Sequence, residues 1–266
     1  MPLVSGVAPV VFSLFSGLAV AVITAPVGVS GAVFLLPIQF SVLQVPSPSV
    51  TPTNLLFNVL SVPGALARYR RHAPLRSPLT GLLLAGTVPG VVVGALVRVL
   101  LLPGPRVFRL FAAALLLPLG LWLCRRGRKP LSGGLSRAQP LSREAIGLLA
   151  LGVGLIGGIY GIGGGSLLSP ILVGRGMDVR LVAPAALTST FVTSVAGAAT
   201  YTALIAANPT LDIAPDWTIG VAAGVGGLLG GYVGASLQPR LPERALRTLL
   251  GVSAIATAAL YLIQSL

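Results

Sequence analysis

Long apolar segments run through the whole chain and constrain its fold more than any other feature. Eight of them approach or exceed the roughly 20 residues that an α-helix needs to cross the hydrocarbon core of a bilayer. They are Val7–Ala25, Val50–Ala67, Pro78–Leu102, Val107–Leu123, Ala145–Tyr160, Leu181–Ala206, Trp217–Leu237 and Arg244–Leu266. We therefore predict an all-α integral membrane protein with about eight long transmembrane helices.

Charged side chains are too scarce for a soluble surface. They make up 9% of the 266 residues, against roughly 25% in an ordinary soluble domain. This shortage excludes a soluble enzyme, a secreted disulfide scaffold and a disordered chain. No stretch alternates in the manner of a barrel strand. The single cysteine, Cys124, permits neither an internal disulfide nor a metal cluster, and we predict no metal and no cofactor.

The net charge of +13 is better explained by membrane topology than by nucleic-acid binding. The basic residues lie in short loops between apolar segments and form no continuous face with interleaved aromatics. Four loops hold 15 of the 18, namely Arg68–Arg76, Arg125–Arg143, Arg175–Arg180 and Arg240–Arg247. The positive-inside rule places these loops in the cytoplasm. We expect a multi-pass protein of the cell membrane with both termini extracytoplasmic and the loop Asn208–Asp216 outside.

Two shorter apolar segments, Val27–Leu43 and Gly163–Val173, are punctuated by Gly and Pro. Both are marginal for a full span, and we predict short or re-entrant helices there. They also carry an internal repeat. When the sequence is aligned with itself at an offset of 133 residues, four residues are identical in the two segments. They are Gly28, Gly31, Leu35 and Pro37, which align with Gly161, Gly164, Leu168 and Pro170.

The repeat divides the chain into a first membrane repeat (1–123), a basic cytoplasmic linker (124–143) and a second membrane repeat (144–266). Each repeat contains five apolar segments, an odd number, so the second enters the membrane from the opposite side. We therefore predict two inverted-topology repeats, an architecture found in many secondary transporters.

The glycine motifs are the first candidate binding site. A Gly run that interrupts a membrane helix frees backbone N–H groups, which must meet a partner or line a cavity. A short helix starting at Gly31 or Gly164 would present N–H donors and a partial positive charge to an anion. The alternative is that glycine merely allows close helix packing. The candidate residues are Gly28, Ser30, Gly31, Gly161, Gly163, Gly164, Gly165 and Ser166.

Polar side chains in the segment after each short helix are the second candidate. Asn54 and Asn58 share one helical face at i, i+4, and Thr188 and Ser189 are their nearest counterparts in the other repeat. Each needs a hydrogen-bond partner in apolar surroundings. They could bind a substrate, or they could join helices as interhelical hydrogen bonds.

No acidic residue lies inside a predicted long span, which argues against a carboxylate-lined cation path. Arg98 lies near the outer end of its span, where we expect it to snorkel to the interface. The lone His72 lies in a basic loop and is expected at the surface. With no nucleophile–base pair and no metal ligands in the spans, we predict that the protein is not an enzyme.

Ile162–Pro170 (IGGGSLLSP), its counterpart ending in Pro37, and Asn54–Ser61 (NLLFNVLS) before a basic loop resemble the sulfite exporter TauE/SafE family of membrane permeases. The resemblance spans nearly the whole chain. It implies transport of a small sulfur-containing anion such as sulfite, sulfoacetate or another sulfonate, and it implies two inverted repeats.

We therefore expect a secondary transporter, and the basic loops favour export. Its partners would be a small anionic substrate and the lipid bilayer, with no nucleic acid. The alternatives are a transporter of another small solute, such as a carboxylate or a metal ion, and a non-transporting membrane scaffold subunit. The sequence leaves the coupling ion and the oligomeric state open, a homodimer included.

Overall fold

The computed structural model describes residues 6–101, 141–175, 177–210 and 212–240, together with residue 242 and isolated helical residues between 110 and 125 and between 248 and 263. Most of the predicted spans Val107–Leu123 and Arg244–Leu266, and most of the basic linker, therefore lie outside the described residues.

The described part of the chain is helical and contains no strand. Six helices are long, and between them lie two short helices, a 3₁₀ turn and a π-helical turn. In chain order the elements are α1 (Val7–Thr24), η1 (Ala25–Val27), α2 (Ala32–Pro37), η2 (Ile38–Val42), α3 (Ser47–Tyr69), α4 (Pro78–Leu100), α6 (Arg143–Tyr160), α7 (Leu168–Gly174), α8 (Val179–Ala207) and α9 (Trp217–Leu237).

Five of these helices are long and apolar enough to cross a membrane: α1, α4, α6, α8 and α9. The protein is therefore a multi-pass membrane protein. The sixth long helix, α3, has the length but not the apolarity, because it carries a row of buried Ser, Thr and Asn side chains.

Side-chain caps and prolines fix where the long helices begin. Ser77, Ser142 and Asp216 each accept a hydrogen bond from the backbone three residues ahead, which satisfies an otherwise unpaired N–H of the first turn. Asp178 does the same two residues ahead and starts α8 earlier than the apolar pattern predicted. Pro48 in the first turn of α3 likewise extends that helix upstream of the expected Val50.

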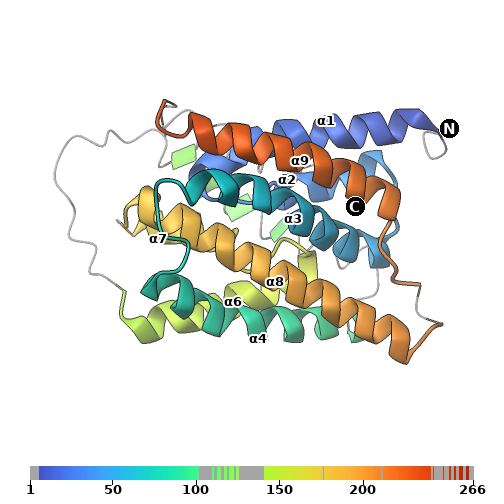
Figure 1. Ribbon diagram of the computed structural model, residues 1–266. Helices are drawn as coiled ribbons and strands as arrows, with labels where there is room; N and C mark the ends of the chain where they lie inside the picture. The colour runs from blue at the N-terminus through green and yellow to red at the C-terminus, as the bar shows by residue number, and fades with distance from the viewer. Residues whose placement is uncertain are drawn as a thin grey trace.

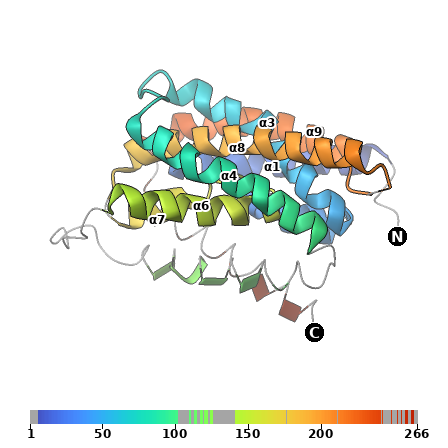
Figure 2. The ribbon, with the colours of Figure 1, turned by 90° about the horizontal axis from the view of Figure 1, so that it is seen from below.

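The long helices form two groups that meet along α3 and α8 (Figures 1 and 2). One group contains α1, α3 and α9, which run in the same direction. The other contains α4, α6 and α8, which run in the opposite direction. In each group a helix from early in the chain packs along one from late in the chain: α1 along α9, and α4 along α6.

The loops divide by charge between the two ends of the bundle (Figure 1). We call the end where α3 and α9 finish and α4, α6 and α8 start the basic end. It carries Arg68–Arg76, Arg175, Arg180 and Arg240. The opposite end carries Asp212 and Asp216 and is called the acidic end. This agrees with the predicted sorting of the described loops between two sides of a membrane.

Glycine lets both helix pairs pack backbone against backbone. A Cβ on Gly226 would collide with the carbonyl of Leu14 in α1. A Cβ on Gly154 in α6 would lie 2.5 Å from the carbonyl oxygen of Thr87 in α4. Such close approach is how membrane helices gain dispersion contacts where no hydrophobic effect drives them together.

Gly154→Val should therefore lower the stability of the bundle. The added side chain must push α6 away from α4, at a cost of about 1–3 kcal/mol for overpacking. A matched control is Gly152→Val, because a Cβ on Gly152 in the same helix meets nothing within 4 Å. Thermal unfolding of the purified protein in detergent should show a lower Tm for Gly154→Val alone. Equal Tm values for the two variants would contradict this packing.

Candidate functional site

Glycines interrupt the helical structure at two places inside the bundle, as the sequence predicted. Gly28 follows α1 and η1 with a φ of 73°, and Gly161 ends α6 with a φ of 70°. Both are in the left-handed region that glycine adopts without strain. A Cβ on Gly28 would lie 2.5 Å from the Cα of Ala183 in α8, and one on Gly161 would strike the carbonyl of Thr51 in α3. Each break thus lies against the central helix of the other half of the chain.

Ser30, Asn58 and Gly161 form one hydrogen-bonded group at the junction of these breaks. The hydroxyl of Ser30 donates to Oδ1 of Asn58 and accepts from the backbone N–H of Ala32 at 3.1 Å. Nδ2 of Asn58 donates to the carbonyl of Gly161 at 3.3 Å. Gly31, the N-cap of α2, packs against the ring of Phe57. The structure therefore brings the first glycine motif, α3 and the second glycine motif together.

Asn54 makes a second bridge one turn away on α3. Its Nδ2 donates to the carbonyl of Ala32 at 3.0 Å and to that of Tyr160 at 3.4 Å. Its Oδ1 is buried and has no hydrogen-bond partner among the described residues. In this conformation the two asparagines join helices, which is the interhelical role that the sequence had left open.

The second glycine motif is paired with α8. The N–H of Gly164, which we expected to face an anion, donates to Oγ1 of Thr193 at 2.9 Å. Ser166 donates to the carbonyl of Ile162 at 2.7 Å and lies 3.4 Å from Oγ1 of Thr190. Residues 164–167 form a turn, so α7 starts at Leu168 and not at Gly164.

The remaining close contacts of this motif also involve α8. A Cβ on Gly163 would lie 2.6 Å from Cγ2 of Thr190, and one on Gly165 would overlap the carbonyl of Ala186. These two glycines are therefore required by packing in the conformation described, whatever else they do.

Thr188 and Ser189 are not counterparts of Asn54 and Asn58 in their contacts. Ser189 is fully buried and its hydroxyl lies 2.9 Å from Oγ1 of Thr87 in α4. Thr188 is half-buried and donates to the carbonyl of Pro184 in its own helix at 2.7 Å. The structure thus places Ser189 at a helix interface and leaves Thr188 outside the bridges between the halves.

Arg98 corrects an expectation from the sequence. It was expected to reach the membrane surface, but it is only 2% exposed and lies inside the bundle near the acidic end. Its guanidinium donates to the carbonyl of Ser47 at 2.6 Å, to Oγ of Ser47 at 2.7 Å and to Oγ1 of Thr51 at 3.4 Å. Hydropathy places an arginine along a span but does not identify the neighbours that cover it.

These contacts belong to a continuous polar row on α3, of which the sequence predicted only Asn54 and Asn58. Its members follow the spacing i, i+4, i+7, i+11 and i+14, so they lie on one face of the helix. All are buried, and the row runs from Arg98 past both helix breaks toward the basic end. The members are Ser47, Thr51, Asn54, Asn58 and Ser61. The helical spacing was the available signal for Ser47 and Thr51.

Gln39 is a further buried polar residue that was not predicted from the sequence. It lies in the π-helical turn η2, is fully buried, and both amide atoms have no hydrogen-bond partner among the described residues. Single π-helical turns occur frequently at functional sites. The predicted short helix Val27–Leu43 gave no indication of this turn.

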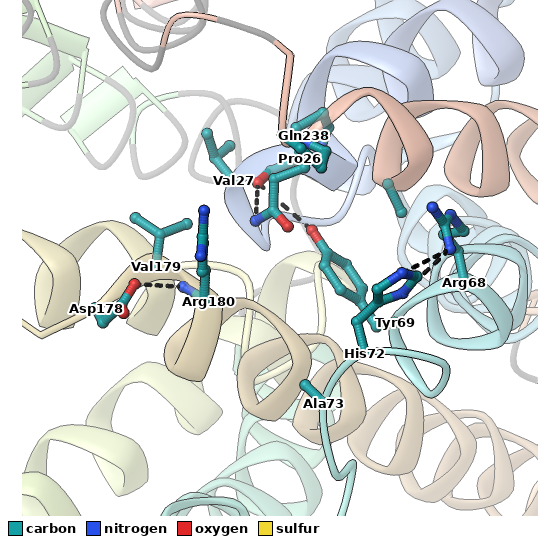
Figure 3. A pocket seen from close by; sticks show the side chains of 12 residues that line it. Pro26, Val27, Arg68, Tyr69, His72, Ala73, Asp178, Val179, Arg180 and Gln238 are labelled. Atoms are coloured by element: carbon teal, nitrogen blue, oxygen red, sulfur yellow. Dashed lines mark hydrogen bonds between the residues drawn. The ribbon is translucent and has the colours of Figure 1, made fainter.

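A pocket of about 610 Å³ opens at the basic end, beyond the helix breaks. Arg180 extends from one wall, while Tyr69, His72 and Arg68 line the other (Figure 3). Tyr69 donates to the carbonyl of Ala25 at 2.9 Å. His72 lies at the exposed rim, as predicted. Among the described residues, no three His, Cys, Asp or Glu side chains gather as metal ligands.

Comparison with known proteins identifies the chain's relatives at the level of a family. The family model described as Sulfite exporter TauE/SafE matches residues 13–261, nearly the full length. Neither a curated protein nor a solved structure matches the chain. The match confirms the resemblance drawn from the glycine and asparagine motifs.

The bridging role of Asn58 can be tested by Asn58→Leu, which keeps the size of the side chain and removes its amide. Loss of the amide leaves Ser30 and the carbonyl of Gly161 without their partner. An unsatisfied buried group costs about 1–3 kcal/mol, so the Tm should fall by several degrees. Thr188→Val is the control, and it should change the Tm little. A Tm for Asn58→Leu as high as that of the control would contradict the bridge.

Proposed function

The chain belongs to the sulfite exporter TauE/SafE family, and from that premise we propose that it is a secondary transporter of a small organosulfur oxyanion such as sulfite, sulfoacetate or another sulfonate. This is a family of membrane transporters of sulfur anions and not of enzymes. The observation that carries the proposal is the buried polar row on α3, which contacts Ser30 beside the first break and Gly161 at the second inside the bundle.

The proposed substrate site lies where the two breaks approach α3 and α8. Substrate would exchange with hydrogen bonds that now join the halves, chiefly those of Ser30, Asn58 and the Gly164 N–H. Backbone N–H groups and neutral hydroxyls can bind an oxyanion without a compensating cation. The proposed site comprises Gly28, Ser30, Gly31, Asn54, Asn58, Gly161, Gly163, Gly164, Gly165, Ser166 and Ser189, with Thr188 at its edge.

We further propose that the chain is built from two inverted repeats that rock about this site to give alternating access. Two features support this. The first long helices of the two halves, α1 and α6, run in opposite directions (Figure 1). The last described helix of each half, α4 or α9, packs along the first helix of the other half. This reciprocal exchange is expected for a two-fold axis in the membrane plane.

The basic end would face the cytoplasm of a cell membrane under the positive-inside rule, and both termini would be extracytoplasmic. Export is favoured because cytoplasmic arginines raise the local concentration of anions at the inner mouth. An anion is favoured over a metal ion because the acidic residues among the described ones, Glu144, Asp178, Asp212 and Asp216, lie at helix ends or in loops.

The proposal is tested by thermal unfolding of the detergent-solubilised protein with sulfite, sulfoacetate, sulfate, acetate and divalent metals. A ligand that binds only the folded state adds about 2.7 kcal/mol at a hundred times its Kd. At roughly 2–4 °C per kcal/mol for a protein of this size, sulfite or sulfoacetate should raise the Tm by about 5–10 °C. Efflux of the same anion from proteoliposomes would then show transport.

Ser30→Ala should weaken this binding at least tenfold, because a hydrogen bond to a charged group contributes about 1.5–3 kcal/mol. Ser13→Ala is the matched control, since Ser13 is equally buried but bonds only to Pro9 in its own helix. A Tm shift with metals or acetate alone would replace the organosulfur substrate by another solute. No shift with any compound, together with no efflux, would favour a membrane scaffold.

A further inference from the structure

The pocket at the basic end carries more positive than negative charge. Its lining includes two arginines, Arg68 and Arg180, against one acidic residue, Asp178. The carboxylate of Asp178 accepts a hydrogen bond from the backbone N–H of Arg180 at 2.9 Å, as the N-cap of α8. It is therefore held at the helix start, to the side of the pocket (Figure 3).

The two guanidinium groups are placed differently. Arg68 is half-buried and fixed, because its Nε donates to Oγ of Ser236 at 3.1 Å and its terminal nitrogen lies 3.1 Å from Nδ1 of His72. The guanidinium of Arg180 is exposed and makes no hydrogen bond to the described residues. One wall thus carries a preorganised cation and the facing wall an available one (Figure 3).

The floor of the pocket is made by the chain that leads to Gly28. Carbonyl oxygens exposed there would repel an anion, but donors cover them. Gln238 donates to the carbonyl of Pro26 at 2.8 Å, Tyr69 donates to that of Ala25, and Ser169 donates to that of Val27 at 2.6 Å. The floor therefore presents little negative potential beneath the arginines.

From this arrangement we propose that the pocket is a capture site for small sulfur oxyanions, separate from the buried site and one step before it. Arg68 and Arg180 attract the anion from opposite walls. Pro26 and Val27 line the pocket, and Ser30, which bonds to Asn58, follows Val27 by three residues in the chain. This inference rests on the proposed function, because it assumes that a sulfur oxyanion is the substrate.

The test compares sulfite binding to the wild-type protein and two double variants in nanodiscs of zwitterionic lipid. Arg68→Gln/Arg180→Gln removes the two pocket charges. Arg70→Gln/Arg71→Gln removes two charges from the adjoining loop that do not line the pocket. At about 0.1 M salt, where screening acts over roughly 10 Å, we expect the pocket variant to bind about tenfold more weakly. The loop variant should stay within about twofold of the wild type.

Two further measurements exclude the possibility that the pocket variant binds weakly because its structure is disturbed. One raises the salt concentration, and the other uses a variant that removes a negative charge from the pocket. At about 1 M salt, where screening acts over roughly 3 Å, the difference between wild type and pocket variant should largely vanish. Asp178→Asn keeps an N-cap, because Asn caps helices as well as Asp, and removes the negative charge. It should bind sulfite about two- to threefold more tightly at about 0.1 M salt. A misfolded variant would not gain affinity.

The outcomes separate this inference from the proposed function. If the wild type binds sulfite and the pocket variant binds it equally well, the capture site is wrong and the transporter proposal stands. If no variant binds sulfite or sulfoacetate, the transporter proposal itself fails. If anionic lipid in the nanodisc blocks sulfite binding in the wild type but not in the pocket variant, the arginines hold lipid phosphate, which overturns the capture site.

Discussion

The fold depends on how its two helix breaks are compensated inside an apolar medium. The breaks at Gly28 and Gly161 interrupt the regular hydrogen bonding of membrane helices, and the backbone groups freed there need partners. At the second break Asn54 and Asn58 of α3 donate to the carbonyls of Tyr160 and Gly161. Before Gly28, donors from Tyr69, Gln238 and Ser169 cover the carbonyls of residues 25–27. The polar row that lowers the apolarity of α3 thus compensates the second break. The candidate site and the contacts that join the two halves of the chain therefore share residues, Asn54 and Asn58 among them.

Local patterns in the sequence were sufficient for much of this arrangement. The apolar segments gave the described long helices to within a few residues, and the i, i+4 spacing of Asn54 and Asn58 correctly placed them on one face. The glycine motif at 161–165 correctly marked a break. These features depend on neighbours within a turn or two of helix, which a single sequence contains.

Features that depend on contacts between distant segments were not predictable in this way. Arg98 is buried because Ser47 and Thr51 of another helix receive its guanidinium. The turn before α7 forms where Thr193 of α8 takes the N–H of Gly164. The pocket combines the ends of three long helices with η1. No spacing within one segment reports which partner a side chain meets across the bundle.

The pairing of α1 with α9 also has a consequence for biosynthesis. Of the described helices α1 is made before the others, yet it packs along the last of them, α9, so α1 has to wait for this partner until the other described helices have been translated. The high mean hydropathy of α1 makes it stable in lipid before its partner helix is present. α3 is less apolar than the five candidate spans, and its asparagines bond to segments that lie elsewhere in the chain. The order in which helices leave the ribosome therefore differs from the order in which they complete their packing.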